Sequence, residues 1–327
     1  MYPELPLWAA SLLIVGGLLA LAWSSDRFVL GAASLARNLG VSPFIVGMVI
    51  VGFGTSAPEL LVSTFSGLGG HTNLSLGNAY GSCIFNIAGI LGVAALVRPI
   101  AVKRQIRTIA VPLLLAVCGV SLFLLRDNAL SRTNALTLLG IFAVVMPLYC
   151  KADKSGNDSG DGATLSAALA AMWTLVGLVT MIGASHILVW GSVAVAQSFG
   201  VSDLMIGLTI VAIGTSVPEL ASAVAAARRG EPELVLGNIV GSNLFNMLAV
   251  VGIAGAISPS DGFSKYVMMR DLPVLALTTM AICIFGRAGK DPDGKGSISR
   301  VEGLIWLLAF IAYTCVMICQ EKSITGV

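Results

Sequence analysis

The sequence has few charged residues. Only 11% of its 327 residues are Asp, Glu, Lys or Arg, whereas 56% are hydrophobic, and the mean hydropathy is +0.91. Soluble domains carry roughly 25% charged residues. The composition therefore excludes a soluble globular protein, and no polar stretch is long enough to form a separate soluble domain.

Metal-binding patterns of histidine and cysteine are also missing. The chain has two histidines, and its six cysteines form neither a Cys-x-x-Cys pair nor a Cys/His spacing typical of zinc sites. We therefore expect no thiolate or imidazole metal centre and no cofactor, and we expect the cysteines to act as small apolar residues. No nucleic acid and no obligate protein partner are expected either.

The N-terminus lacks the basic residues that begin a cleaved signal peptide. The stretch from Met1 to Trp8 contains Glu4 and no Lys or Arg. We therefore expect the first apolar run to be retained as a membrane helix.

Long apolar runs are what the sequence does have. A helix that crosses a bilayer needs about 20 apolar residues, and a turn signal at 69–73 divides the longest run into two helices. The sequence thus predicts an all-α membrane protein with ten transmembrane helices. The runs, interrupted only by Glu59 and Glu219, are 5–25, 38–97, 108–125, 133–150, 162–202, 204–227, 234–260, 272–286 and 303–320.

An internal repeat divides the chain into two halves. With a shift of 160 positions, 40–92 aligns with 200–252 without a gap, and 22 of the 53 positions are identical. The repeat covers five helices in each half, and because five is odd the two copies are expected to cross the membrane in opposite directions. We therefore expect a first five-helix repeat over 1–150, a short cytoplasmic linker over 151–162 and a second, inverted repeat over 163–327.

Lys and Arg are unevenly distributed among the expected loops. With the N-terminus outside, fourteen of the 19 basic residues fall on the cytoplasmic side and five on the other. Cytoplasmic loops are enriched in Lys and Arg. This favours a bacterial inner-membrane protein with both termini in the periplasm.

The strongest chemical signal is a carboxylate within each half's uncharged run. Gly54-Thr-Ser-Ala-Pro-Glu-Leu60 returns as Gly214-Thr-Ser-Val-Pro-Glu-Leu220. A carboxylate at mid-membrane costs about 2.5–3.5 kcal/mol on insertion scales. Because neither run contains Lys or Arg, the partner that offsets this cost is expected to be a bound cation or a proton.

The residues around each Glu supply oxygen ligands. Proline removes the hydrogen bond to the carbonyl four residues earlier, so Pro58 frees the oxygen near Gly54 and Pro218 the one near Gly214. Oxygen-only ligands suit Ca²⁺ and Na⁺. The side chains that we expect to coordinate the cation with Glu59 and Glu219 are Thr55, Ser56, Ser82 and Asn86 from the first half and Thr215, Ser216, Ser242 and Asn246 from the second.

These residues resemble the two alpha-repeats of the cation/calcium antiporter superfamily, in particular its prokaryotic sodium/calcium exchanger branch. The resemblance covers essentially the whole chain. It implies that Glu59 and Glu219 are bridging carboxylates and that backbone oxygens near Gly52 and Ala212 complete the site. It also implies that two long helices, here about 6–37 and 163–199, slide across a rigid core to alternate access.

The resemblance implies exchange of Ca²⁺ for Na⁺, with the lipid bilayer as the protein's environment. Some exchangers of this branch carry Asp where this chain has Asn246, so only two carboxylates remain. They neutralise one Ca²⁺, whereas several bound Na⁺ would leave excess positive charge. Ca²⁺/H⁺ exchange at the same carboxylates is therefore the alternative.

Two other classes of function are weaker alternatives. The inverted repeat and paired buried site favour an antiporter over an ion channel. An intramembrane hydrolase would use Ser56 or Ser216 as its nucleophile, yet no His or Lys base accompanies either motif.

The stretch 291–302 resembles an EF-hand loop, with acidic residues at positions 1, 3 and 12 and Gly296 at position 6. Lys295 stands where an oxygen ligand is wanted. Ser299-Arg300 matches Ser131-Arg132 of the first half, a match that we call the Ser-Arg echo. It indicates that an ordinary helix begins at Ser299, in place of a calcium-binding loop.

Overall fold

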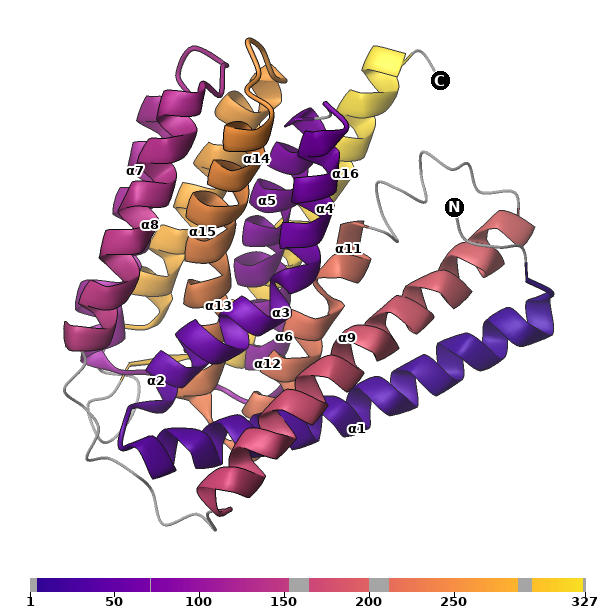
Figure 1. Ribbon diagram of the computed structural model, residues 1–327, viewed down its shortest axis with the longest axis vertical. Helices are drawn as coiled ribbons and strands as arrows, with labels where there is room; N and C mark the ends of the chain where they lie inside the picture. The colour runs from indigo at the N-terminus through magenta and orange to yellow at the C-terminus, as the bar shows by residue number, and fades with distance from the viewer. Residues whose placement is uncertain (1–4, 71, 153–164, 200–211, 288–295, 326–327) are drawn as a thin grey trace.

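The computed structural model describes residues 5–70, 72–152, 165–199, 212–287 and 296–325 (Figure 1). Its elements are helices with two short strands; η marks π-helical segments, whose turns are wider than those of an α-helix. The first half contains α1 (Leu7–Leu39), α2 (Pro43–Val46), η1 (Gly47–Val51), α3 (Gly52–Thr55), α4 (Ala57–Leu68), α5 (Thr72–Ile84), η2 (Phe85–Leu91), α6 (Gly92–Val97), β1 (Ile100–Val102), η3 (Ile106–Ala110), α7 (Val111–Leu124) and α8 (Arg132–Ala152).

The second half begins with a helix nearly as long as α1. Its elements are α9 (Ala167–Ser198), α11 (Ala212–Thr215), α12 (Val217–Arg229), α13 (Pro232–Leu244), η5 (Phe245–Val250), α14 (Val251–Ile257), η6 (Val267–Asp271), α15 (Leu272–Phe285), β2 (Gly296–Ile298) and α16 (Arg300–Thr325).

The number of membrane spans can be compared with the expected ten. Within the described ranges, eight helices are long and apolar enough to cross a membrane, and the bent pair Pro43–Thr55 and Ala57–Leu68 makes a ninth. The remaining expected span, 204–227, falls partly outside the described residues, and its described part is α11 and α12. The protein is thus a multi-pass membrane protein, while ten helices and the inverted arrangement stay predictions.

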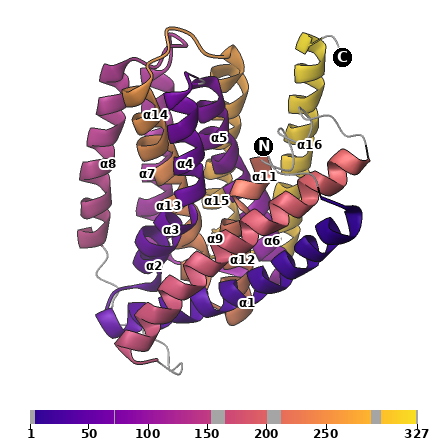
Figure 2. The ribbon, with the colours of Figure 1, turned by 45° about the vertical axis from the view of Figure 1, so that its right-hand side comes forward.

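Two long helices lie together across one face of the bundle. α1 has 33 residues and α9 has 32, close to the lengths expected from the sequence. Figures 1 and 2 show them side by side and steeply inclined to the other helices. Small residues allow this close contact, because a Cβ at Gly177 of α9 would lie 2.7 Å from the Phe28 backbone of α1.

Both Gly-Thr-Ser-x-Pro-Glu motifs contain a break in the helix. Ser56 has φ −81° and ψ 6° between α3 and α4, and Ser216 has φ −94° and ψ 10° between α11 and α12. The proline two residues later lies in the first turn of α4 or α12, where its missing N–H leaves no helical hydrogen bond unmade. The motif therefore ends one short helix and begins the next.

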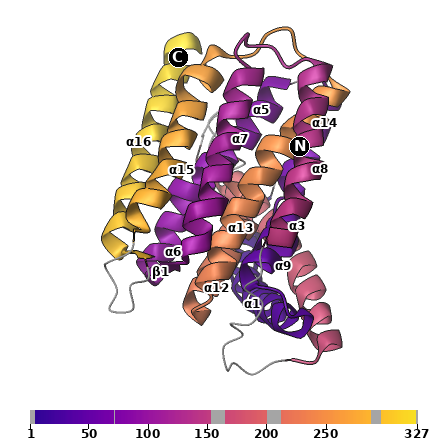
Figure 3. The ribbon, with the colours of Figure 1, turned by 90° about the vertical axis from the view of Figure 1, so that its left-hand side faces the viewer.

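A short strand pair lies at one end of the predominantly helical bundle, where Figure 3 labels β1. β1 and β2 run antiparallel, with Ile100 opposite Ile298. Two connections from different halves meet at this end of the bundle and satisfy each other's backbone hydrogen bonds. The sequence pattern did not predict this pair, whereas the helical character expected of the chain is confirmed among the described residues.

The two serines of the Ser-Arg echo begin helices, as expected. The Ser131 hydroxyl accepts from the Asn134 backbone N–H at the start of α8. At the start of α16, Ser299 and Glu302 form a capping box, since the Glu302 carboxylate accepts from the Ser299 backbone N–H at 2.7 Å. Glu302, the twelfth residue of the EF-hand-like stretch, thus has a structural role.

Two of the sequence-based expectations fall on residues outside the described ranges. These are most of the linker 151–162 and residues 291–295 of the EF-hand-like stretch.

The η1 segment packs closely on α13. A Cβ at Gly47 would lie 2.8 Å from the Leu234 carbonyl oxygen, and Cβ atoms at Gly237 and Gly241 would clash with the backbone at Phe44 and Met48. Only glycine permits this approach of the two backbones. This packing places α3, which contains the first two residues of the Gly54–Leu60 motif, directly against α13 of the second half.

Candidate cation-binding site

The two motif carboxylates are buried at the starts of half-helices. Glu59 lies in the first turn of α4 and is 0% exposed, and Glu219 lies in the first turn of α12 and is 2% exposed. The N-terminus of a helix carries unpaired N–H groups and a partial positive charge. The helix breaks therefore make it possible for a carboxylate to lie inside the bundle.

Each carboxylate accepts a hydrogen bond from the serine of the other repeat. The Ser216 hydroxyl donates to Glu59 Oε1 at 2.8 Å, and the Ser56 hydroxyl donates to Glu219 Oε1 at 3.1 Å. Reciprocal contacts of this kind are characteristic of a two-fold relation between two units. The repeated motifs, 160 residues apart in the chain, thus form one site.

The hydroxyl groups of the expected ligand set surround these carboxylates. Thr215 and Ser82 lie against the Glu59 carboxylate, and Thr55 lies against that of Glu219. The Ser82 hydroxyl lies 3.1 Å from that of Ser216 and can donate to it, because the one Ser216 hydrogen is directed to Glu59.

Ser242 contacts one of the two expected backbone ligands. Its hydroxyl lies 3.3 Å from the Gly52 carbonyl oxygen and 3.4 Å from Asn238 Oδ1, and it can donate its one hydrogen to either. The carbonyl expected to bind the cation therefore lies within hydrogen-bond distance of a side chain of the opposite repeat. Ala212, the counterpart of Gly52, is the first residue of α11.

The two asparagines of the expected set lie in π-helical segments. Asn86 is the second residue of η2 and Asn246 the second residue of η5, and both are buried. π-Helical turns occur frequently at functional sites. The hydrophobic pattern did not predict these wider turns.

Several oxygen atoms of the site have no hydrogen-bond partner within the described residues. They are Glu59 Oε2, Glu219 Oε2, Asn86 Oδ1 and Asn246 Oδ1. Buried polar atoms are rarely left unpaired. Four unpaired oxygens in one buried region are the arrangement that a desolvated cation would satisfy.

Basic side chains pair with acids at other places. Within the described part of the chain, the ion pairs are Arg37–Glu231, Lys103–Glu233, Arg229–Asp26 and Arg270–Asp271, none of which involves Glu59 or Glu219. Outside the membrane spans, burial raises the pKa of Glu231 and the Arg37 guanidinium opposes that rise.

Two further asparagines connect the helices of each repeat. Asn78 donates to the Glu59 carbonyl at 3.2 Å and to the Ser63 hydroxyl at 3.1 Å. Asn238 makes the same contacts with the Glu219 carbonyl and Ser222, at 3.4 and 2.9 Å. Sequence reasoning did not include them in the site, although their identity in both repeats was a usable signal.

The Gly214 carbonyl, one of the two that proline is expected to free, has a side-chain partner on another helix. The Ser185 hydroxyl of α9 donates to the Gly214 carbonyl at 3.0 Å. Ser25, the counterpart of Ser185 in α1, instead donates to the Ala22 carbonyl within its own helix. The Gly214 carbonyl is therefore a point of contact with the long helix α9.

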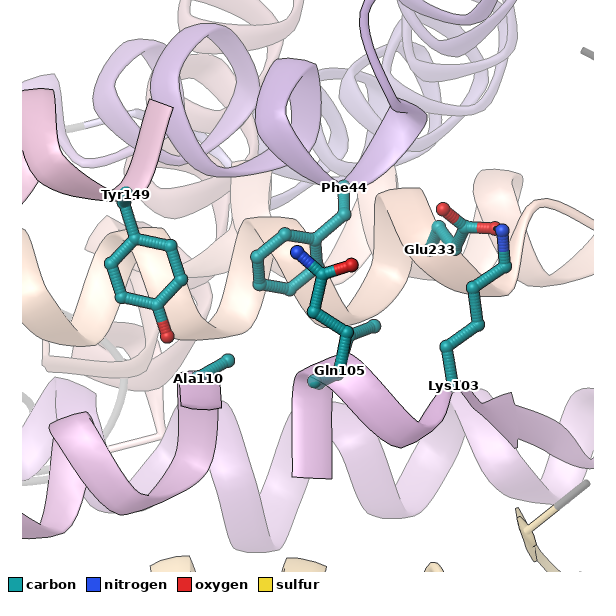
Figure 4. A pocket seen from close by; sticks show the side chains of 7 residues that line it. Phe44, Lys103, Gln105, Ala110, Tyr149 and Glu233 are labelled. Atoms are coloured by element: carbon teal, nitrogen blue, oxygen red, sulfur yellow. Dashed lines mark ion pairs between the residues drawn. The ribbon is translucent and has the colours of Figure 1, made fainter. Parts of the chain in front are cut away.

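A small surface pocket lies apart from this site. It is lined by Phe44, Gln105, Tyr149 and the Lys103–Glu233 ion pair, among others (Figure 4). Its volume of about 20 Å³ is room for roughly one water molecule. None of the expected ligands lines it.

Comparison with known proteins places the chain in a family. The sodium/calcium exchanger protein family matches residues 9–149 and 169–319. CaxA of Alkalimonas amylolytica is 41% identical over 93% of this chain and 97% of its own length, and the inner membrane protein YrbG of Escherichia coli K12 is 36% identical over 92% and 96%.

A solved structure agrees with the fold. The sodium-calcium exchanger NCX_Mj, soaked with zero Na⁺ and Ca²⁺, superimposes with a TM-score of 0.83 at 27% identity, over 95% of this chain and 100% of that one. Together with the family match over most of the sequence, these similarities show that the chain belongs to the sodium/calcium exchanger family.

Proposed function

We propose that this protein is a secondary active antiporter that exchanges Ca²⁺ for Na⁺ across the bacterial inner membrane by alternating access. The observation that carries the proposal is the pair of reciprocal bonds, Ser216 to Glu59 and Ser56 to Glu219, which joins two buried carboxylates that make no ion pair within the described residues. Membership of a family of exchangers makes the protein a transporter rather than an enzyme.

The donor atoms suit Ca²⁺. Carboxylate, hydroxyl, amide and carbonyl oxygens are the ligands that this hard cation accepts, at about 2.3–2.6 Å. Two carboxylates carry the charge that balances one Ca²⁺. We propose that the cation bridges Glu59 and Glu219 and binds oxygens of Thr55, Ser56, Ser82, Asn86, Thr215, Ser216, Ser242, Asn246, Gly52 and Ala212.

The duplicated architecture supports transport by alternating access. Two homologous halves that meet at a central buried site, on interrupted helices, are typical of secondary transporters. We propose that 1–150 and 163–327 are inverted repeats, that both termini are periplasmic, and that α1 and α9 slide across the rest of the bundle. Their close pairing on one face agrees with movement as a unit (Figure 2).

Sodium is favoured as the coupling ion by similarity. The family is named for sodium/calcium exchange, and NCX_Mj carries that name as well. The neutral side chain of Asn246 favours the alternative, Ca²⁺/H⁺ exchange, because two carboxylates can also release Ca²⁺ by binding protons. Both alternatives use the same pair of carboxylates.

The test is ⁴⁵Ca²⁺ uptake into proteoliposomes with an outward Na⁺ gradient or an outward H⁺ gradient imposed separately. We expect uptake with the Na⁺ gradient alone, lost in Glu219→Gln. Uptake with the H⁺ gradient alone would overturn the sodium coupling and leave the calcium site intact. Absence of uptake with either gradient would contradict Ca²⁺ as the substrate.

A further inference from the structure

A third asparagine, Asn243, connects the two repeats beside the cation site. It follows Ser242 on α13 and is 0% exposed. Its Oδ1 accepts from Asn86 Nδ2 at 3.0 Å, and its Nδ2 donates to the Cys83 carbonyl at 3.2 Å. Both atoms of this side-chain amide are thus used in contacts with the first repeat.

These contacts determine which atom Asn86 turns toward the site. The Cys83 carbonyl can only accept, so the Asn243 atom facing it must be the nitrogen. The Asn243 oxygen then faces Asn86, whose nitrogen must be the donor. The remaining atom of the Asn86 amide is Oδ1, the oxygen that has no partner within the described residues.

The second site asparagine has no equivalent restraint. Residue 83 is the counterpart of Asn243 in the repeat, and it is a cysteine: Gly-Ser-Cys-Ile-Phe-Asn ends at Asn86 where Gly-Ser-Asn-Leu-Phe-Asn ends at Asn246. The Cys83 thiol is near enough to Asn246 for a weak polar contact, but the two are not in hydrogen-bond geometry. A thiol is a weak donor and a weak acceptor, and neither amide atom of Asn246 has a hydrogen-bond partner within the described residues.

We propose that Asn243 is a positioning residue that holds the Asn86 amide with its oxygen toward the bound cation, whereas Cys83 leaves the Asn246 amide free to turn. The inference rests on the proposed function, because it requires a cation between the two halves. It makes the two asparagine ligands inequivalent, although the motifs around them are repeated.

The physical basis is the difference between the two ends of an amide. The oxygen attracts a cation, while the NH₂ group carries partial positive charge and repels it. An unrestrained amide must be oriented when the cation binds, and that ordering lowers the affinity. Asn86 is therefore the stronger ligand of the two.

The test replaces Asn243 by the residue that its counterpart already is. In purified Asn243→Cys, we expect the apparent Ca²⁺ affinity, measured by Ca²⁺-dependent thermal stabilisation, to fall about tenfold, as for loss of one buried hydrogen bond to a polar group. The KM for Ca²⁺ in proteoliposomes should rise by the same factor, with the maximal rate changed less than about twofold. Ser121→Ala, which removes a buried hydroxyl of α7 outside the site, is the control and should change neither value.

A double-mutant cycle separates positioning from a general structural role. Aspartate at position 86 presents an oxygen whichever way it turns, so in the Asn86→Asp background Asn243→Cys should cost no affinity or should increase it. An equal loss of affinity in both backgrounds, or no loss in the otherwise wild-type chain, would overturn the proposal.

The exchange variant Cys83→Asn/Asn243→Cys provides a second test if Asn243→Cys alone does not fold. Asn86→Ala should weaken Ca²⁺ binding more than Asn246→Ala in the wild-type chain, and this order should reverse in the exchange variant. An unchanged order would contradict the proposal. If no cation stabilises even the wild-type protein, the proposed cation site fails, and the inference with it; a wild-type protein that binds Ca²⁺ but is insensitive to Asn243 refutes the inference alone.

Discussion

The two repeats share a motif but differ in how deeply one span of each is buried. The most apolar stretch of the α13–α14 span is 100% buried within the protein, while that of the corresponding α5–α6 span is 72% buried. Asn238 is 1% exposed, whereas its counterpart Asn78 is half-buried. η1 fits closely against Gly237 and Gly241 of α13, and its counterpart in the second half, 207–211, lies outside the described residues.

Both repeats carry the same ligand residues, whereas the residues around those ligands differ. Glu59 and Glu219 have reciprocal serine partners, yet Ser216 makes an additional contact with Ser82 that has no described equivalent at Ser56. A cation between two nearly symmetric carboxylates therefore meets an asymmetric outer environment. Variants of residues in both repeats test this asymmetry.

The largest effect is expected at the carboxylates, where the repeats should behave alike. Glu59→Gln and Glu219→Gln each remove one of two charges that balance the cation. Each should lower Ca²⁺ uptake at least about a hundredfold, since breaking a buried charge pair costs about 3–5 kcal/mol. A variant that retains wild-type uptake in the proteoliposome assay would show that its carboxylate does not bind the transported cation.

A glycine substitution should show the close packing of η1 on α13. A Cβ at Gly241 would clash with the Met48 backbone, so Gly241→Ala should lower the free energy of unfolding by about 1–3 kcal/mol. Gly140→Ala on α8, where nothing among the described residues lies within 4 Å of the added Cβ, is the control and should change it by less than about 0.5 kcal/mol beyond helix propensity. The measurement is thermal unfolding of both purified proteins, and equal shifts in Tm would contradict the close packing of η1 on α13.

The two serines should differ by a smaller factor. Ser216→Ala removes hydrogen bonds to both Glu59 and Ser82, while Ser56→Ala removes one described side-chain bond, to Glu219. At about 0.5–1.5 kcal/mol for each bond, the KM for Ca²⁺ should rise about tenfold in the first variant and about threefold in the second. A larger rise in KM for Ser56→Ala than for Ser216→Ala would contradict this asymmetry.

The smallest effect is expected at the ion pair that joins α1 to α12. Arg229 donates to Asp26 through two nitrogens at 2.7 and 2.8 Å, but Asp26 is 48% exposed. Arg229→Gln should therefore change the free energy of unfolding by less than about 1 kcal/mol, and less still at high salt. A loss of several kcal/mol, or one insensitive to salt, would mean that the pair is shielded from solvent.

The motif residues could be predicted from the sequence for a simple physical reason. An uncompensated Glu in an apolar run is costly, and the same costly arrangement occurred twice in register around Glu59 and Glu219. The long helix α9 could be predicted because it lies within a single charge-free run, whereas α1 continues past the run 5–25 through Asp26 and Arg27, and its length was expected from the family resemblance.

Other features could not be predicted because they depend on contacts between the halves. Asn243 has no identical counterpart in the first repeat, so the alignment gave it no weight. The pairing of β1 with β2 joins connections almost 200 residues apart, and the Ser185–Gly214 contact depends on how α9 lies against the site. Hydrophobic pattern carries no information on such contacts.

The most direct test of the central claim is a crystal structure of the protein soaked with Sr²⁺, whose anomalous scattering locates a divalent cation. A cation site shared by the two repeats predicts one dominant anomalous peak between Glu59 and Glu219, within coordinating distance of both carboxylates and of the Asn86 oxygen. A dominant peak elsewhere, or carboxylates that remain bonded only to Ser56 and Ser216 at saturating Sr²⁺, would contradict a shared cation site between the two repeats.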